Sequence, residues 1–212
     1  MESTRVIAVR HGETAWNVDT RIQGQLDIEL NDTGLWQARR VAKALLEEPI
    51  SAIYASDLAR AWQTAKEIGE LRGLEVATDP GLRERAFGHF EGRTFADIDE
   101  ALPIQARRWR TRDPEFAPEG GESLLTFQER ITSTAARIAA RHPGELVLMV
   151  AHGGVMDVLY RAATRQGLQA PRTWALGNAA INRLLWTPQG FTLVGWADTR
   201  HLSDDVLDET TA

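Results

Sequence analysis

Two short segments of the chain, residues 6–9 and 146–150, are apolar at every position and show no alternation of apolar and polar side chains. Such runs, bounded by polar residues, are typical of strands that are buried on both faces between layers of helices. The other segments that predict strands are residues 52–55, 74–77, 181–186 and 191–196, the last two forming an antiparallel hairpin around a turn at residues 187–190.

Between these strands, apolar residues recur at spacings of three and four, which is the pattern of one buried face of a helix. Asn31, Ser56-Asp57 and Ser123 precede three of these segments, and we expect their side chains to cap the first turns. The predicted helices lie between residues 33 and 47, over residues 58–71, over residues 94–102, between residues 123 and 142, and over residues 155–164.

Strands that alternate with helices predict an α/β fold: a three-layer sandwich with a mainly parallel central sheet flanked by helices. The chain has 212 residues, is 43% hydrophobic and contains no linker-like segment, so we expect residues 1–212 to form a single domain with one sizeable core. Residues 86–122 show the least regular pattern, and we expect them to be a lid or specificity segment of that domain.

Charge and composition narrow the classes of partner. The 24 Lys and Arg residues against 30 Asp and Glu residues give a net charge of -6, which disfavours a broad nucleic-acid surface and means that any anion is bound locally. The chain has no cysteine, which excludes disulfides and thiolate metal sites and fits the cytoplasm. No apolar run is long enough to cross a bilayer, and the first residues lack the pattern of a signal peptide.

Both all-apolar strands lead directly into a His-Gly step, His11-Gly12 and His152-Gly153. The carboxyl ends of parallel strands meet at one edge of a sheet, so we expect the two imidazoles to lie at the same rim. Arg10 ends the first strand and Arg60 lies in the first turn of a helix, where backbone N–H groups favour anions. Two histidines, two arginines and glycines that permit close backbone approach indicate a phosphate or carboxylate site.

A metal site is the main chemical alternative, because His11, His152 and Glu84 could supply two imidazoles and one carboxylate. Arg10 and Arg60 disfavour it, since a cation between them would be repelled, whereas a phosphoryl group would gain charge-assisted hydrogen bonds. The other histidines, which match no motif and are expected to be structural or solvent-exposed, are His89, His142 and His201.

Five segments resemble the motifs of the histidine phosphatase superfamily, the phosphoglycerate-mutase-like proteins. They occur in the family's order across nearly the whole chain, so the resemblance does not depend on one short match. The segments are Arg10-His11-Gly12-Glu13-Thr14 with Asn17, then residues 56–65, Leu82-Arg83-Glu84-Arg85, Gly121-Glu122-Ser123, and Ala151-His152-Gly153.

The resemblance implies a metal-independent mechanism with no cofactor, in which His11 attacks phosphorus and becomes a phosphohistidine. Arg10, Arg60 and His152 would stabilise the transferring phosphoryl group, and Glu84 would act as the general acid. Glu84 could instead be a structural ion-pair partner of its neighbours in sequence. The residues expected to bind substrate are Asn17, Gln23, Gly24, Arg85 and Gly153.

The expected function is hydrolysis of a phosphomonoester, with a small phosphorylated metabolite as partner. Phosphoglycerate-mutase-type phosphoryl transfer is the alternative, and a non-catalytic phosphate-binding module is the third possibility. The sequence His152-Gly153-Gly154-Val155 lacks the Asn that mutases carry after the second His-Gly, whereas Glu84-Arg85 resembles the mutase pattern. The basic stretch at residues 107–112 is either part of a lid or a solvated surface, and the oligomeric state stays open.

Overall fold

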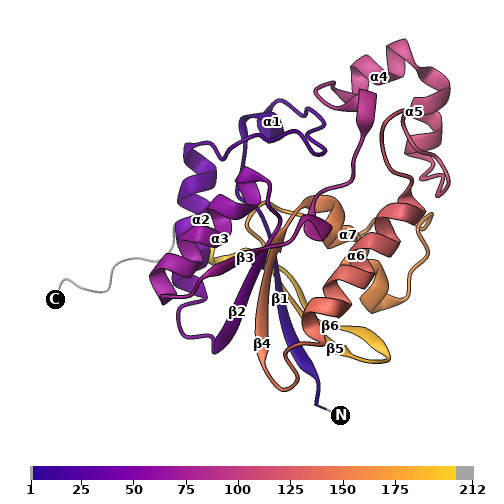
Figure 1. Cartoon of the computed structure of the whole chain (residues 1–212). Coiled ribbons are helices and arrows are strands. Elements are labelled where there is room, and N and C mark those ends of the chain that lie inside the picture. Colours follow the sequence, from indigo (N-terminus) through magenta and orange to yellow (C-terminus); the bar gives the residue numbers. More distant parts are fainter. Residues whose placement is uncertain (1, 204–212) are drawn as a thin grey trace.

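The computed structural model describes residues 2–203, and its centre is a six-stranded sheet in the order β3-β2-β4-β1-β5-β6 (Figure 1). The three pairings among β3, β2, β4 and β1 are parallel, and β5 joins β1 and β6 in antiparallel pairings. The expected mainly parallel α/β sheet is confirmed. The strands are β1 (Thr4–Arg10), β2 (Ile50–Ala55), β3 (Val76–Thr78), β4 (Leu146–Ala151), β5 (Ile181–Thr187) and β6 (Gly190–Asp198).

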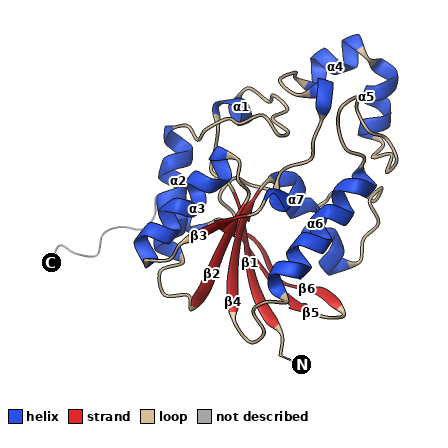
Figure 2. Ribbon diagram, viewed as in Figure 1, coloured by secondary structure: helices blue, strands red, loops and turns tan. Residues whose placement is uncertain are grey.

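Helices cover both faces of the sheet, which produces the expected three layers (Figure 2). On β1, Val6 and Ala8 pack in one hydrophobic cluster with α6 (Leu124–Ala139) and α7 (Gly153–Thr164). Ile7 and Val9 point to the other face and pack with α2 (Asp32–Ala44) and α3 (Ala59–Arg72). All six residues of β4 are buried, as a strand between two helical layers requires. Within residues 2–203, no helix is both long and apolar enough to cross a membrane.

Two of the expected helix caps are present. The side chain of Asn31 accepts a hydrogen bond from the N–H of Gly34 at 2.8 Å, and Ser123 accepts one from Thr126 at 3.1 Å. Each cap satisfies an N–H of a first turn that has no partner within its own helix, which stabilises the helix by about 1 kcal/mol. These helices therefore begin where the local sequence places them.

The cap expected from Ser56 and Asp57 is wrong. Asp57 instead accepts two hydrogen bonds from Arg83, at 2.8 and 2.6 Å, and this ion pair lowers the pKa of Asp57. A side chain from a distant loop binds the first turn of α3 instead: the backbone N–H of Ala59 donates a hydrogen bond to the carboxylate of Asp27 at 2.7 Å. A bidentate arginine is a stronger partner for Asp57 than one backbone N–H.

Residues 86–122 contain two helices rather than the single one expected there, α4 (Phe95–Ala101) and α5 (Pro103–Arg110). Pro103 stands at the first position of α5, where its fixed φ angle and missing N–H are tolerated. Most of the basic stretch is the last turn of α5. We call residues 86–122 the cap segment, because its helices lie beyond the carboxyl ends of the parallel strands (Figure 1). Its own small core consists of Phe90, Ile98, Ala106 and Phe116.

Two glycines bring the first turn of α2 against the loop that follows β1. A Cβ atom at Gly12 would lie 2.4 Å from the carbonyl oxygen of Gly34, and one at Gly34 would lie 2.1 Å from the carbonyl oxygen of Glu13. Both distances are far shorter than a van der Waals contact, so only glycine fits at either position. This backbone contact fixes the loop that begins at His11.

We expect Gly34→Ala to destabilise the protein by about 1–3 kcal/mol, the usual cost of overpacking, and to displace the loop after β1. Thermal unfolding measures the change. Gly167→Ala is the matched control, because a Cβ atom at Gly167 meets nothing within 4 Å and its φ angle lies outside the left-handed region. Equal melting temperatures for both variants would contradict the proposed close contact.

Candidate active site

The two His-Gly steps meet at the carboxyl edge of the sheet. β1 and β4 pair in parallel up to Arg10 and Ala151, and the N–H of His11 donates to the carbonyl of Ala151 at 2.9 Å. The imidazoles of His11 and His152 consequently face each other edge to face, with ring centroids 5.3 Å apart. Neighbouring parallel strands thus bring together two residues that are 141 positions apart in sequence.

A cavity of about 180 Å³, which we call the His11 cavity, opens at this edge. Besides His11 itself, six of the residues expected from the sequence line it, and the cap segment closes it with Phe87 and Trp109. Arg21, which follows the short helix α1 (Ala15–Val18), also lines it. The six residues are Arg10, Asn17, Gln23, Gly24, Arg60 and Glu84.

Two arginines supply positive charge to the cavity, and one of them, Arg60, is fully buried. Arg60 donates to the carbonyls of Leu26 at 2.8 Å and Gly24 at 2.7 Å, and Arg10 donates to the carbonyl of Leu176. In the described part of the chain, the Nε atom of each arginine is buried and has no hydrogen-bond partner. Burial lowers the pKa of Arg60 to about 10, so Arg60 is still a cation at neutral pH. The site therefore holds two fixed cations with unused donors, which suits an anion.

The tautomer of His11 follows from one short hydrogen bond. Nδ1 of His11 lies 2.6 Å from the carbonyl oxygen of Gly12. A carbonyl can only accept, so Nδ1 carries the proton and Nε2 carries the free electron pair. Burial first, then the charges of Arg10 and Arg60, lower the pKa of His11 well below its usual value. His11 is therefore neutral, and its Nε2 atom is available as a nucleophile.

His152 is the residue that precedes α7, and its ring packs against that of His11. Both of its ring nitrogens are buried and lack a hydrogen-bond partner among residues 2–203. Burial, the charge of Arg60 and the proximity of His11 lower the pKa of His152 well below its usual value. His152 is fully buried and, unlike His11, is not among the residues that line the His11 cavity. A neutral imidazole can donate one hydrogen bond and accept another.

Glu84 is held by backbone groups rather than by an ion pair. Its carboxylate accepts hydrogen bonds from the N–H of Arg85 at 2.8 Å and the N–H of Gly154 at 2.9 Å. Arg83 pairs with Asp57 and Arg85 donates to backbone carbonyls, so neither neighbour forms the ion pair that was the structural alternative for Glu84. A Cβ atom at Gly154 would lie 2.2 Å from Oε1 of Glu84, so this glycine makes room for the carboxylate at the first turn of α7.

Two residues expected to bind substrate do not line the His11 cavity. Arg85 is only 3% exposed, and its Nε and Nη2 atoms donate to the carbonyls of Glu122 at 2.9 Å and Phe116 at 2.8 Å. It anchors the cap segment and faces a neighbouring cavity. Gly153 lies against Arg10, because a Cβ atom there would be 3.3 Å from Nε of Arg10. The absence of a side chain at Gly153 therefore leaves room for the side chain of Arg10.

Asn178, which no sequence motif indicated, organises the nucleophile loop. Its Nδ2 atom lies 3.0 Å from the carbonyl oxygen of His11, 3.2 Å from that of Gly12 and 3.2 Å from Oδ1 of Asn17. The N–H and hydroxyl of Thr14 also donate to Oδ1 of Asn17, each at 3.1 Å. The amide oxygen of Asn17 is thus fully occupied, which leaves its NH₂ group to donate into the cavity. Asn178 lies in the irregular loop before β5, and the hydrophobic periodicity used to predict helices and strands gives no information about residues in such a loop.

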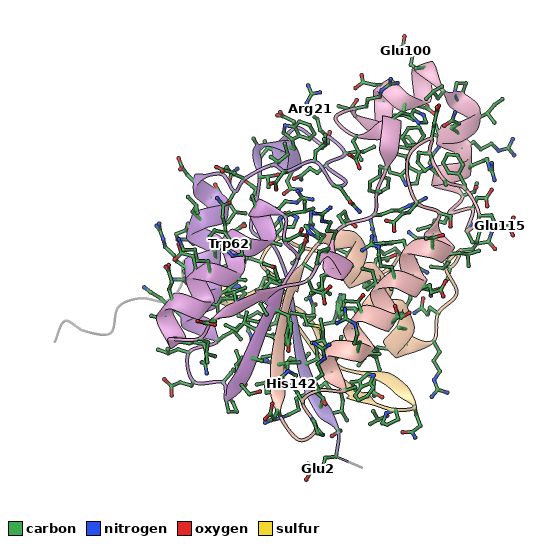
Figure 3. The ribbon with its side chains drawn as sticks, in the orientation of Figure 1. Glu2, Arg21, Trp62, Glu100, Glu115 and His142 are labelled. Atoms are coloured by element: carbon green, nitrogen blue, oxygen red, sulfur yellow. The ribbon has the colours of Figure 1, made fainter. Side chains whose placement is uncertain are left out.

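The acidic and imidazole groups that the structure describes do not assemble a metal site. Within residues 2–203, no group of three or more His, Asp or Glu residues is placed to hold a metal ion, and His11, His152 and Glu84 are no exception. His142 lies at the opposite end of the sheet, near Glu2 (Figure 3), where it contacts the hydroxyl of Tyr54 at 2.9 Å. Its role is structural.

The two buried imidazoles make stability depend on pH in a defined direction. Their pKa values are depressed in the folded protein, so the unfolded chain takes up protons first as the pH falls below about 6.5. When the pH falls from 7.5 to 5.5, we expect each histidine to lower the free energy of unfolding by about 1.4 kcal/mol. Above pH 7.5 we expect no effect from either histidine. Urea unfolding of the wild type and of His152→Gln measures this, and the variant should lose less stability on acidification. Identical losses would contradict the burial of a neutral His152.

Relatives of the chain extend over nearly its whole length. It is 38% identical over 208 residues to phosphoglycerate mutase-like protein 4 of Arabidopsis thaliana, covering 96% of this chain and 89% of the relative. It is 35% identical over 224 residues to glucosyl-3-phosphoglycerate phosphatase of Mycobacterium tuberculosis, covering 98% and 100%. A metal-independent phosphoserine phosphatase of A. thaliana is 37% identical over 205 residues, with coverage of 95% and 84%.

A solved structure supports the same relationship. The mycobacterial glucosyl-3-phosphoglycerate phosphatase, complexed with VO3, superposes with a TM-score of 0.81 at 35% identity, covering 92% of this chain and 99% of that chain. The sequence model of the histidine phosphatase superfamily (branch 1) matches residues 6–199, and the chain therefore belongs to this family.

Proposed function

We propose that the protein hydrolyses phosphomonoesters through a phosphohistidine formed on His11. The observation that carries the proposal is the state of His11: neutral, with its proton held on Nδ1 by the carbonyl of Gly12 and Nε2 free, in a cavity with Arg10 and Arg60. Relatives named as phosphatases support hydrolysis. The proposed substrate is a small phosphorylated metabolite. We also propose a cytoplasmic location, from the absence of cysteine.

In the first step, Nε2 of His11 forms a bond to phosphorus while the bond from phosphorus to the ester oxygen breaks on the opposite side. Arg10, Arg60 and His152 donate to the three phosphoryl oxygens, where charge accumulates in the transition state. Asn17 adds a neutral donor. As the phosphohistidine forms, the hydrogen bond from Nδ1 to the carbonyl of Gly12 stabilises the positive charge that develops on the ring.

Glu84 supplies and then recovers one proton. The acid gives its proton to the leaving ester oxygen, and the resulting carboxylate then takes a proton from the water that attacks phosphorus. Phosphate leaves, His11 returns to its neutral form and Glu84 is protonated again, so the cycle is balanced.

Phosphoryl transfer of the mutase type is the second candidate, favoured by relatives named as a mutase-like protein and as probable phosphoglycerate mutases. It uses the same first step but passes the phosphoryl group to a second hydroxyl rather than to water. A phosphoenzyme that hydrolyses within one turnover favours the phosphatase, and one that persists until an acceptor is added favours the mutase.

A trapping experiment tests the proposed function. The protein is incubated briefly with a ³²P-labelled phosphomonoester and quenched at alkaline pH. The labelled protein should be stable to base and labile to acid, and the label should map to His11. We expect His11→Ala to carry no label and to lose turnover while keeping the same melting temperature within a few degrees. Label on a serine, or turnover by the His11→Ala variant, would show that His11 is not the nucleophile.

The role of Glu84 predicts a dependence on the leaving group. Glu84→Gln keeps the shape and hydrogen bonds but cannot donate an acidic proton, so phosphorylation by an alkyl phosphate should slow by about 10²-fold. An aryl phosphate with a stable phenolate leaving group should be affected much less. Single-turnover rates of the first step measure both, and an equal loss for the two substrates would exclude Glu84 as the acid.

The position of Asn178 predicts a loss in kcat rather than in binding. Asn178→Ala removes one donor from the loop of His11 and from Asn17, so kcat should fall by about 2- to 10-fold, the worth of one hydrogen bond, with little change in KM. Steady-state kinetics test this. An unchanged kcat would show that the loop holds its geometry without Asn178.

A further inference from the structure

The peptide unit between Gly12 and Glu13 controls the tautomer of His11. Its carbonyl oxygen, that of Gly12, lies 2.6 Å from Nδ1 of the ring and accepts the proton there. In a neutral imidazole, the hydrogen bond that one ring nitrogen makes decides which of the two carries the proton. If this carbonyl turned away, nothing would hold the proton on Nδ1, and a proton on Nε2 would remove the nucleophilic electron pair. The nucleophile therefore depends on the orientation of one peptide unit.

The chain is held on both sides of this peptide unit. Before it, the N–H of Gly12 donates to the hydroxyl of Thr64 at 3.0 Å. After it, the carbonyl of Glu13 accepts from the N–H of Asn31 at 3.0 Å. These contacts leave one motion open, a rotation of the planar unit about the line that joins its two Cα atoms. Glycine resists such a rotation least, because its backbone has the widest range of φ and ψ angles.

Gln37 is the side chain that opposes this rotation. The N–H of Glu13 lies on the opposite side of the same planar unit from the carbonyl of Gly12, and it donates to Oε1 of Gln37 at 2.8 Å. A backbone N–H can only donate, so the oxygen of the Gln37 amide faces it. Gln37 is half-buried in the second turn of α2, a helix that the Asn31 cap and the close contact at Gly34 hold against the loop.

The contact also acts through the electrons of the peptide unit. One hydrogen-bonded chain runs from Nδ1 of His11 through the carbonyl of Gly12 and the N–H of Glu13 to Gln37. Hydrogen bonds in such a chain polarise one another, so the bond to Gln37 makes the carbonyl a stronger acceptor. As Nε2 bonds to phosphorus, the ring gains positive charge and its remaining N–H becomes a stronger donor. The chain is therefore strongest in the transition state, which raises kcat rather than substrate affinity.

Asn178 contacts the same carbonyl but cannot replace Gln37. Its NH₂ group has two hydrogens for three acceptors at 3.0–3.2 Å, namely the carbonyls of His11 and Gly12 and Oδ1 of Asn17. It also approaches the carbonyl side of the peptide unit, as the His11 ring does. Only Gln37, among the residues that the structure describes, accepts from the N–H side.

We propose that Gln37 is a positioning residue for the nucleophile: it holds the peptide unit of Gly12 and Glu13 so that His11 keeps its proton on Nδ1. Gln37 does not line the His11 cavity, so it acts through the loop and not on the substrate. The effect on turnover rests on the proposed function, because it takes His11 to be the nucleophile. The effect on the tautomer can be measured without any substrate.

Gln37→Met tests the effect on turnover. Methionine matches glutamine in length and helix propensity, but its thioether is only a weak acceptor. We expect kcat for p-nitrophenyl phosphate to fall by about 3- to 10-fold, the scale of one hydrogen bond, with a change in KM of at most about twofold. Gln37→Glu keeps an acceptor oxygen at the same position and should recover most of the lost kcat.

Gln128→Met is the matched control. Gln128 is also a half-buried glutamine in a helix, α6, but it does not line the His11 cavity and its side chain forms no hydrogen bond within residues 2–203. This variant should keep the wild-type kcat and KM. A fall in kcat equal to that of Gln37→Met would overturn the proposal.

NMR of protein with ¹⁵N-labelled histidine rings measures the tautomer directly. The signals of His11, identified by their loss in His11→Gln, should show a protonated Nδ1 and an unprotonated Nε2 in the wild type. In Gln37→Met at the same pH, the two ¹⁵N shifts should move towards each other as the second tautomer becomes populated, and Gln128→Met should not change them. Wild-type shifts in Gln37→Met would overturn the proposal, even with a lowered melting temperature, because they would leave Gln37 a purely structural role.

The two measurements separate this inference from the proposed function. Wild-type shifts and wild-type kcat in Gln37→Met, together with phosphoryl label on His11, would overturn the role of Gln37 and leave the proposed function standing. Turnover by His11→Ala would overturn the proposed function, and with it the nucleophile that Gln37 is proposed to position.

Discussion

The parallel pairing of β1 with β4 is the constraint on which the site depends. The hydrogen bond from His11 to the carbonyl of Ala151 extends that pairing by one residue past Arg10, so the two strands end together and their histidines meet. Both strands are buried between helical layers, so a slip of one residue would move every side chain of the strand from one core to the other and disrupt the packing of both. The register that packs the core also sets the distance between the imidazoles.

Burial of charge is the second organising feature. Burial first, and then the positive charge of Arg10 and Arg60, lowers the pKa of both imidazoles well below the usual value. Donors that remain unpaired in a buried site reduce stability, and they become favourable only when an anion binds them. The close contacts of Gly12 with Gly34 and of Gly154 with Glu84 fix the surrounding backbone, so the cavity needs little rearrangement to bind an anion.

The residues around the His11 cavity come from two parts of the fold. Arg10 and His11 stand at and just after the end of β1 and Arg60 in the first turn of α3, whereas Phe87 and Trp109 come from the cap segment. The cavity therefore combines charged groups from the sandwich with apolar walls from the cap segment.

The sequence by itself determined the layered α/β fold, the two His-Gly steps at strand ends and the set of charged residues around them, because hydrophobic periodicity and turn chemistry are local properties. Tertiary structure alone decided which partner each polar group takes. Asp57 pairs with Arg83 instead of capping α3, Arg85 donates to backbone carbonyls of the cap segment, and Asn178 contacts the loop of His11 from 167 positions away. Packing brings several possible partners close to each polar group, and the most favourable one forms the contact. The spacing of residues along the chain does not show which partners will be close.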